Sequence, residues 1–190
     1  MAFLYNKPIR RILLTVILLW SVGTFYWINQ DGRTLIWLVG LFSIFGLVAI
    51  WKEAIPIALL IFLSFSSSYA FYVFLFQFNL PPWLVMIGVL VIFSYLFTYT
   101  EQKIGILGNK RLLYLILFST IILEIFLLLT FFLIDPINQS LIVALTCYLF
   151  IGYCYTILAK HTDNSFATYL AISSIAALVI LATSRWGGLV

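Results

Sequence analysis

Charge, histidine and cysteine are all scarce in this chain. Only 8% of its 190 residues are charged, and it contains one histidine and two cysteines. Clusters of histidine and cysteine that hold zinc have little to draw on, so we expect neither a metal site nor a cofactor. The cysteines, Cys147 and Cys154, are seven residues apart. On a helix that spacing corresponds to about 10 Å along the axis, too far for them to form a disulfide bond with each other.

Hydrophobic residues are abundant instead. They make up 65% of the chain, and the mean hydropathy is +1.19. A soluble domain of this size cannot bury so much apolar surface. About 20 apolar residues span the hydrocarbon core of a bilayer as a helix. Seven runs of about this length occur, near residues 9–28, 34–51, 54–78, 82–100, 111–134, 137–159 and 165–184.

These runs predict helices rather than strands. They are too long for the strands of a membrane barrel and lack the alternation of apolar and polar residues that such strands show. In lipid, a helix satisfies all its backbone hydrogen bonds within one segment. The connections between the runs are short, so neighbouring helices are expected to be antiparallel. We therefore predict an all-α membrane protein: residues 1–190 form one polytopic domain, a compact bundle of seven transmembrane helices.

The basic residues predict how the bundle is oriented. With the N-terminus in the cytoplasm, eight Lys and Arg residues fall inside and two, Arg33 and Arg185, fall outside. Such a bias in short loops predicts an N-in, C-out topology. The net charge of +4 then reflects membrane orientation, and we predict no nucleic-acid partner. The eight inside residues are Lys7, Arg10, Arg11, Lys52, Lys103, Lys110, Arg111 and Lys160. For Lys103, Lys110 and Arg111 topology is a sufficient explanation, and contact with a lipid headgroup is the alternative.

The prolines argue against one class of transporter. All five, Pro8, Pro56, Pro81, Pro82 and Pro136, lie at or just before expected helix starts, where a missing N–H costs nothing. Carriers with broken helices free their backbone near the middle of the membrane to coordinate ions. The predicted spans contain no proline at that depth, which disfavours a sodium-coupled carrier of this type.

Glu124 is the one ionisable residue well inside a predicted span. A charged carboxylate at that depth costs several kcal/mol, so Glu124 should be protonated, paired or facing a wet cavity. Thr120 precedes it by one helical turn. On one reading, the two residues form a proton-linked or polar-substrate site. On the other, Glu124 is structural and bonds to a neighbouring helix or a partner subunit.

Other polar side chains lie in the third, sixth and seventh runs. The third run contains closely spaced serines, including Ser66 and Ser67, which allow helices to approach closely or line a polar pocket. Tyr148 in the sixth run belongs to a mixed stripe with the same two readings. In the seventh run Ala167, Ala171 and Ser174 share one face, which predicts a tight helix contact.

The residues that known seven-span families require are missing. A retinal protein needs a lysine in its last span, and zinc-dependent seven-span hydrolases need several histidines. A rhomboid-type protease needs a serine motif and a histidine within the membrane. Substrate-binding subunits of energy-coupling-factor importers are similar in size and loop length, but they carry a small-residue motif in the first helix. Here residues 12–27 are bulky. We therefore assign no family and no catalytic residue.

Two functions remain open. We favour a non-enzymatic structural or accessory subunit of a membrane assembly, located in a membrane such as the bacterial inner membrane. Its partners would be the lipid bilayer and a membrane protein. The alternative is a transport component that binds a small solute or lipid through Glu124, Thr120, Ser66, Ser67 and Tyr148. Contact of Glu124 with lipid or a partner chain would favour the first, and a cavity shared with the serines would favour the second.

Overall fold

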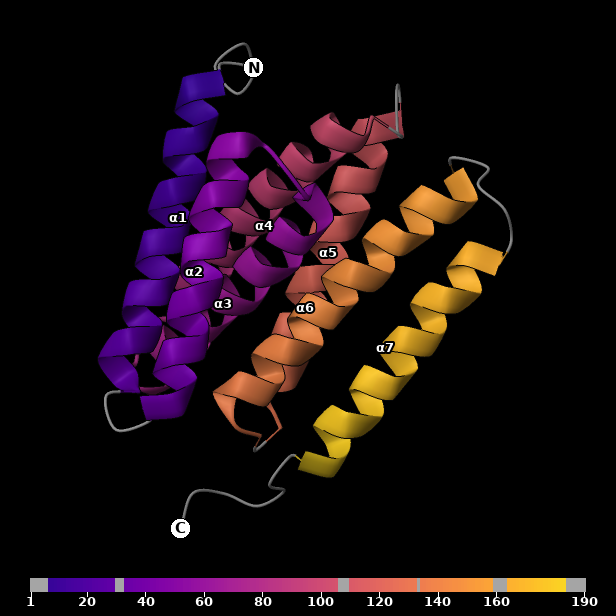
Figure 1. Cartoon of the computed structure of the whole chain (residues 1–190). Helices are drawn as coiled ribbons and strands as arrows, with labels where there is room; N and C mark the ends of the chain where they lie inside the picture. The colour runs from indigo at the N-terminus through magenta and orange to yellow at the C-terminus, as the bar shows by residue number, and fades with distance from the viewer. Residues whose placement is uncertain (1–6, 30–32, 106–109, 133, 159–163, 184–190) are drawn as a thin grey trace.

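The computed structural model describes residues 7–29, 33–105, 110–132, 134–158 and 164–183, and within these ranges the chain forms seven helices and no strand (Figure 1). The all-α bundle predicted from the sequence is confirmed. The helices are α1 (Lys7–Ile28), α2 (Arg33–Lys52), α3 (Pro56–Phe76), α4 (Pro82–Ile104), α5 (Arg111–Thr130), α6 (Pro136–Tyr153), followed directly by a π-helical turn (Cys154–Leu158), and α7 (Asn164–Thr183).

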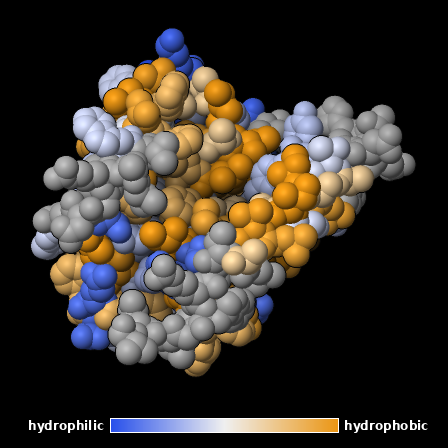
Figure 2. Space-filling model, turned by 60° about the horizontal axis from the view of Figure 1, so that its bottom comes forward, coloured by the Kyte–Doolittle hydropathy of each residue, from blue (hydrophilic) through white to orange (hydrophobic). Residues whose placement is uncertain are grey.

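Five of these helices, α1, α3, α4, α5 and α6, are long and apolar enough to cross a membrane. The other two, α2 and α7, contribute shorter apolar stretches at Val39–Lys52 and Ala167–Ile180 within the described part of the chain. Large hydrophobic side chains are exposed on the outside, among them Trp37 and Phe45 on α2. Figure 2 shows hydrophobic side chains over much of the described surface of one face. This apolar exterior suits a lipid environment.

The helix starts follow from proline chemistry. Pro56, Pro82 and Pro136 are the first residues of α3, α4 and α6, where the fixed φ of proline suits the first turn. The carboxylate of Asp135 also caps α6, because it accepts a hydrogen bond from the backbone N–H of Ile137 at 3.0 Å. The expected start of the third span at Ala54 is two residues early.

Two helix ends differ by four residues from the hydropathy prediction. The helix α4 continues through polar residues to Ile104, four residues past the expected end, and stops where Gly105 adopts a left-handed φ of 69°. The helix α5 ends at Thr130 instead of Ile134. The side-chain amide of Gln139 donates to backbone carbonyls of Leu129 and Phe132, so the end of α5 is satisfied by α6.

The helix α3 is the centre of the bundle. It packs against α1, α2, α4 and α6, and most extensively against α6. Every residue from Ser66 to Val73 is buried, so this stretch is covered on all sides. A helix that is apolar all round is expected at such a position. The helix α5 packs mainly against α4 and α6, and α7 lies at the edge against α6 and the π-helical turn (Figure 1).

Stacked aromatic rings connect the central helices. Tyr72 of α3 stacks on Phe126 of α5 with ring centroids 4.2 Å apart, and its hydroxyl donates to the carbonyl of Phe126 at 3.1 Å. Phe97 of α4 stacks on Phe118 of α5 at 4.7 Å, and Phe150 of α6 packs against both rings. These contacts fix α5 against three neighbours.

Of the small-residue stripe expected on α7, the face with Ala167, Ala171 and Ser174 makes no tight contact among the described residues, whereas Ser173 beside it is buried. Ala167, Ala171 and Ser174 are exposed, so their face points away from α6. The close approach is made from the other side instead, where Tyr169 of α7 covers Gly152 of α6. A Cβ added to Gly152 would come within 2.5 Å of the Tyr169 ring, so glycine is required at this crossing.

Candidate functional site

A groove between α4 and α5 contains the predicted membrane-embedded acid. It has a volume of about 460 Å³ and is lined by nine residues. Glu124 and Thr120 both line it, and both side chains are exposed. The nine lining residues are Leu90, Ser94, Leu115, Ile116, Ser119, Thr120, Leu123, Glu124 and Leu127.

A hydroxyl pair joins the two walls of this groove. The hydroxyl oxygens of Ser94 on α4 and Ser119 on α5 are 2.8 Å apart, and Ser119 also donates to the carbonyl of Leu115 at 2.8 Å. Ser119 is buried, whereas Glu124 lies one and a half turns further along α5 and faces outward. The Glu124 carboxyl is therefore presented to whatever surrounds the bundle.

The predicted serines lie elsewhere, in the core around α3. Ser66 and Ser67 are both buried, and the hydroxyl of Ser66 accepts a hydrogen bond from Ser21 of α1 at 3.0 Å. Ser66 also donates to the carbonyl of Leu63 within its own helix. This contact between α1 and α3 fits the packing reading of the serines, since short hydroxyl side chains allow helices to approach closely.

Tyr148 occupies a third location, between α6 and α7. Its ring lies 4.9 Å from that of Tyr169, and its side chain is half-buried. Of the five residues predicted for a site, the groove brings together only Glu124 and Thr120. Its nine lining residues come from α4 and α5 alone, so it includes neither the α3 serines nor Tyr148.

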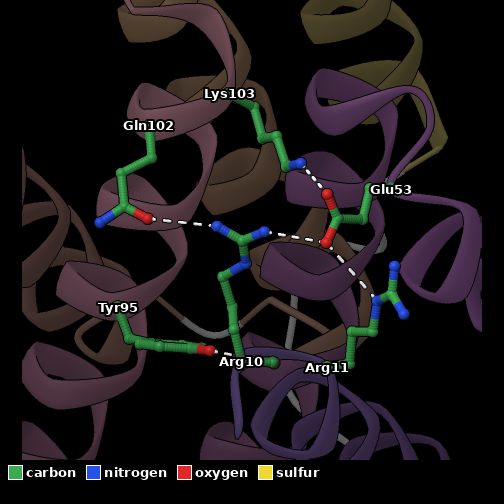
Figure 3. Close-up of polar contacts among 6 residues, drawn as sticks. All are labelled: Arg10, Arg11, Glu53, Tyr95, Gln102 and Lys103. Atoms are coloured by element: carbon green, nitrogen blue, oxygen red, sulfur yellow. Dashed lines mark hydrogen bonds and ion pairs between the residues drawn. The ribbon is translucent and has the colours of Figure 1, made fainter. Parts of the chain in front are cut away.

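A cluster of charged side chains at one end of the bundle is a second candidate (Figure 3). The carboxylate of Glu53, in the turn between α2 and α3, faces Arg10 and Arg11 of α1 and Lys103 of α4. The Nη2 atom of Arg10 is 2.9 Å from Oε1 of Glu53, and the Nε atom of Arg11 is 3.5 Å from the same oxygen. Lys103 pairs with Oε2. Glu53 thus connects α1, the α2–α3 turn and α4, and we call these four residues the Glu53 cluster.

The local backbone and the surrounding charges both act on Glu53. Its φ is 52°, and that of Ile55 is 50°, so two residues without the freedom of glycine adopt left-handed conformations in this turn. A hydrogen bond from Lys103 and then one from Arg10 lower the pKa of the Glu53 carboxyl from 4.5 to about 2, against the opposing effect of burial. Glu53 is therefore ionised near neutral pH and acts as a fixed anion.

Neighbouring side chains hold Arg10 in place. Its guanidinium lies 5.3 Å from the centre of the Tyr99 ring and contacts Oε1 of Gln102 at 3.4 Å. The Tyr95 hydroxyl donates to the backbone carbonyl of Arg10 at 3.1 Å. The Arg10 side chain is only 9% exposed. The cluster is thus a partly buried, organised arrangement of charges, which distinguishes it from an array of freely solvated surface residues.

This arrangement adds a specific partner to the topological explanation of Lys103. Lys103 belongs to the Glu53 cluster, and Arg111 pairs with Glu101 at 2.9 Å nearby. The sequence signal is a carboxylate in the two-residue connection, residues 52 and 53, between two apolar runs. Its partners are 43 and 50 residues away along the chain, so their pairing could not be read from spacing.

The described residues contain no group of three or more His, Cys, Asp or Glu side chains that could hold a metal ion. The groove offers one carboxyl and three hydroxyl groups, and the end of the bundle offers clustered cations, so both places present groups that can bind polar partners. No protein-family model matches the chain, and no curated protein or solved structure matches it either.

Proposed function

We propose that this protein is a non-enzymatic accessory or structural subunit of a membrane assembly, and that the α4–α5 groove receives a transmembrane helix of its partner. The observation that carries the proposal is the outward position of Glu124 in this groove. A charged carboxylate exposed at mid-helix costs several kcal/mol in lipid, and a protonated one still lacks a hydrogen-bond partner there. A helix that presents a hydroxyl, amide or basic side chain at this depth would provide one.

The groove also suits such an occupant in shape. Most of its lining is aliphatic, and the Ser94–Ser119 pair draws the two walls together at one point. In membranes, helices associate through close packing combined with a few interhelical hydrogen bonds. Thr120 and Glu124, one turn apart, provide two polar groups on one helix face for this purpose.

The proposal includes an orientation. All seven helices cross the membrane, with the N-terminus in the cytoplasm, as in a bacterial inner membrane. At the end of the bundle where α1 begins, the described ranges contain seven basic residues and two acidic ones, Glu53 and Glu101. This excess supports a cytoplasmic location for that end. The seven are Lys7, Arg10, Arg11, Lys52, Lys103, Lys110 and Arg111. Lys160 and Arg185, which were also used for the topology prediction, lie outside the described residues.

The test is purification in a mild detergent with mass spectrometry of the proteins and lipids that remain bound. We expect a membrane protein in fixed stoichiometry with the wild type. Glu124→Leu should abolish this association, because it removes the polar group while keeping an outward-facing side chain that lipid tolerates. Glu124→Gln should retain most of it, since an amide can still form hydrogen bonds.

A matched control and a position-specific probe make this test sharper. Ile44→Ala changes an exposed side chain in the middle of α2 and should leave the partner bound. A photoreactive group on Cys introduced at Thr120 should crosslink to the partner, whereas the same group at Val48 on α2 should not. If the chain purifies with a bound lipid or small solute in the groove and no protein, the binding and transport alternative replaces this proposal. If a second copy of the chain is its one partner, the accessory role is also contradicted.

A further inference from the structure

The Glu53 cluster contains more positive charge than its own carboxylate can balance. Three cations, Arg10, Arg11 and Lys103, face one anion, which leaves a surplus of two positive charges. The neighbouring Arg111–Glu101 pair is balanced and does not supply the missing anion. The side chains are partly withdrawn from solvent, with exposures of 9% for Arg10 and 23% for Lys103. Uncompensated charge in such a setting is costly.

The same cluster contains buried donors without acceptors. Among the described residues, the Nε atoms of Arg10 and Arg11 are buried and have no hydrogen-bond partner, and the same holds for the hydroxyl of Tyr99, whose ring contacts Arg10 beside the cluster. The 3.5 Å approach of Arg11 Nε to Glu53 is a charge contact without hydrogen-bond geometry. Buried polar groups in proteins are nearly always satisfied. All three of these groups donate, so an acceptor-rich ligand would complete the site.

A ligand would reach this cluster from the surface at Arg11. Its side chain is 33% exposed, and its terminal guanidinium nitrogens point away from Glu53 (Figure 3). A guanidinium with free terminal N–H groups matches the oxygen pairs of a phosphate better than a point charge does. Topology requires cations at this end but does not require them to gather around one carboxylate with unfilled donors.

We propose that the Glu53 cluster binds a phosphate-class anion, held by Arg11 from the surface and by the charge of Arg10 and Lys103 from within. The cluster lies at the ends of α1 and α4, where membrane-spanning helices reach the headgroup layer. The phosphodiester of an anionic lipid headgroup and free phosphate share the required chemistry. This site is separate from the groove of Glu124 and does not depend on the function proposed there.

Binding is measured on the full chain in micelles of dodecyl maltoside, a detergent without phosphate, by native mass spectrometry and thermal shift. One series adds increasing amounts of phosphatidylglycerol, and the other adds inorganic phosphate in its place. Saturation in the first series alone identifies a lipid headgroup as the ligand. Saturation in the second as well identifies the phosphate group itself. Absence of saturable binding in both series would overturn the proposal.

Variants separate a specific site from general attraction between charges. Arg11→Gln should weaken binding about tenfold, the loss of one charge-assisted contact. Lys7→Gln removes the same charge from an exposed position on α1 outside the cluster, where salt screens it, and should change affinity less than about twofold. Arg11→Lys keeps the charge but loses the planar fork, and should lie between these two. If Arg11→Gln and Lys7→Gln lose the same amount of affinity, general attraction between charges explains the binding and a specific site is refuted.

Discussion

Replacing Glu53 by glutamine should destabilise the bundle more than any other change of a single acid to its amide in the described residues. The substitution keeps the shape of the side chain and removes the anion that three cations share. It leaves Arg10, Arg11 and Lys103 facing one another with only an amide between them. The contacts that join α1, the α2–α3 turn and α4 are then replaced by repulsion.

The size of the effect follows from how exposed the cluster is. Breaking a fully buried ion pair costs about 3–5 kcal/mol, and an exposed pair is worth about 0–1 kcal/mol. Glu53 is 14% exposed and its partners are 9–33% exposed, so the cluster lies between these limits. We expect the free energy of unfolding to fall by about 2 kcal/mol, a value that already allows for partial screening by solvent. At about 2–4 °C per kcal/mol for a chain of this size, Tm should fall by about 4–8 °C.

The assay is thermal unfolding of purified protein in detergent, followed by tryptophan fluorescence. Glu124→Gln is the matched control, because it makes the same chemical change at an exposed acid and should shift Tm by less than about 1 °C. Added salt should narrow the difference in Tm between Glu53→Gln and wild type, because salt screens the charges of this partly exposed cluster. If Glu53→Gln unfolds at the same temperature as Glu124→Gln, the reasoning about this cluster is refuted.

Three further results are expected. First, the pKa of Glu53 is depressed to about 2, so its stabilisation is complete above about pH 4.5 and is lost as pH falls from 4.5 to 2. The Tm difference between wild type and Glu53→Gln should shrink over that window, and a constant difference would contradict the assignment. Second, Tyr72→Phe removes one hydrogen bond to Phe126 and keeps the stacked ring, so it should cost about 0.5–1.5 kcal/mol by unfolding in denaturant, whereas Tyr72→Ala should cost at least about 3 kcal/mol. Third, Gly152→Leu should displace α7 and increase proteolysis between α6 and α7, whereas Ala171→Leu, on the exposed face, should not.

The sequence predicted the helices well because each is defined locally. The helices α3, α4 and α6 each start with a proline that is followed by about 20 apolar residues. This pattern predicts the first residue of each helix to within two residues. Hydropathy fails at the helix ends that depend on other signals. The end of α4 depends on the left-handed Gly105 and not on the first charged residue, and the end of α5 depends on Gln139 reaching back from α6.

The candidate sites were less predictable, because they are formed by contacts distant in sequence. Glu124 and Thr120 share a helix face by their spacing alone, so their common groove could be expected. Whether that face points inward or outward depends on how α4 and α5 pack, which no local pattern specifies. The pairing of Glu53 with Arg10 and Lys103 joins three separate helix ends, and the hydropathy of each run gives no sign of it.

The central position of α3 has a consequence for how the protein is made. During synthesis α3 enters the membrane before α4 and α6, the helices against which it packs most extensively. Until they emerge, part of its serine-rich surface faces lipid. Bonds of its hydroxyls to its own backbone, such as Ser68 to the carbonyl of Ser64 at 2.7 Å, make this stage tolerable. The bond from Ser21 of α1 to Ser66 of α3 is one that this stage already allows, because α1 precedes α3 in the chain.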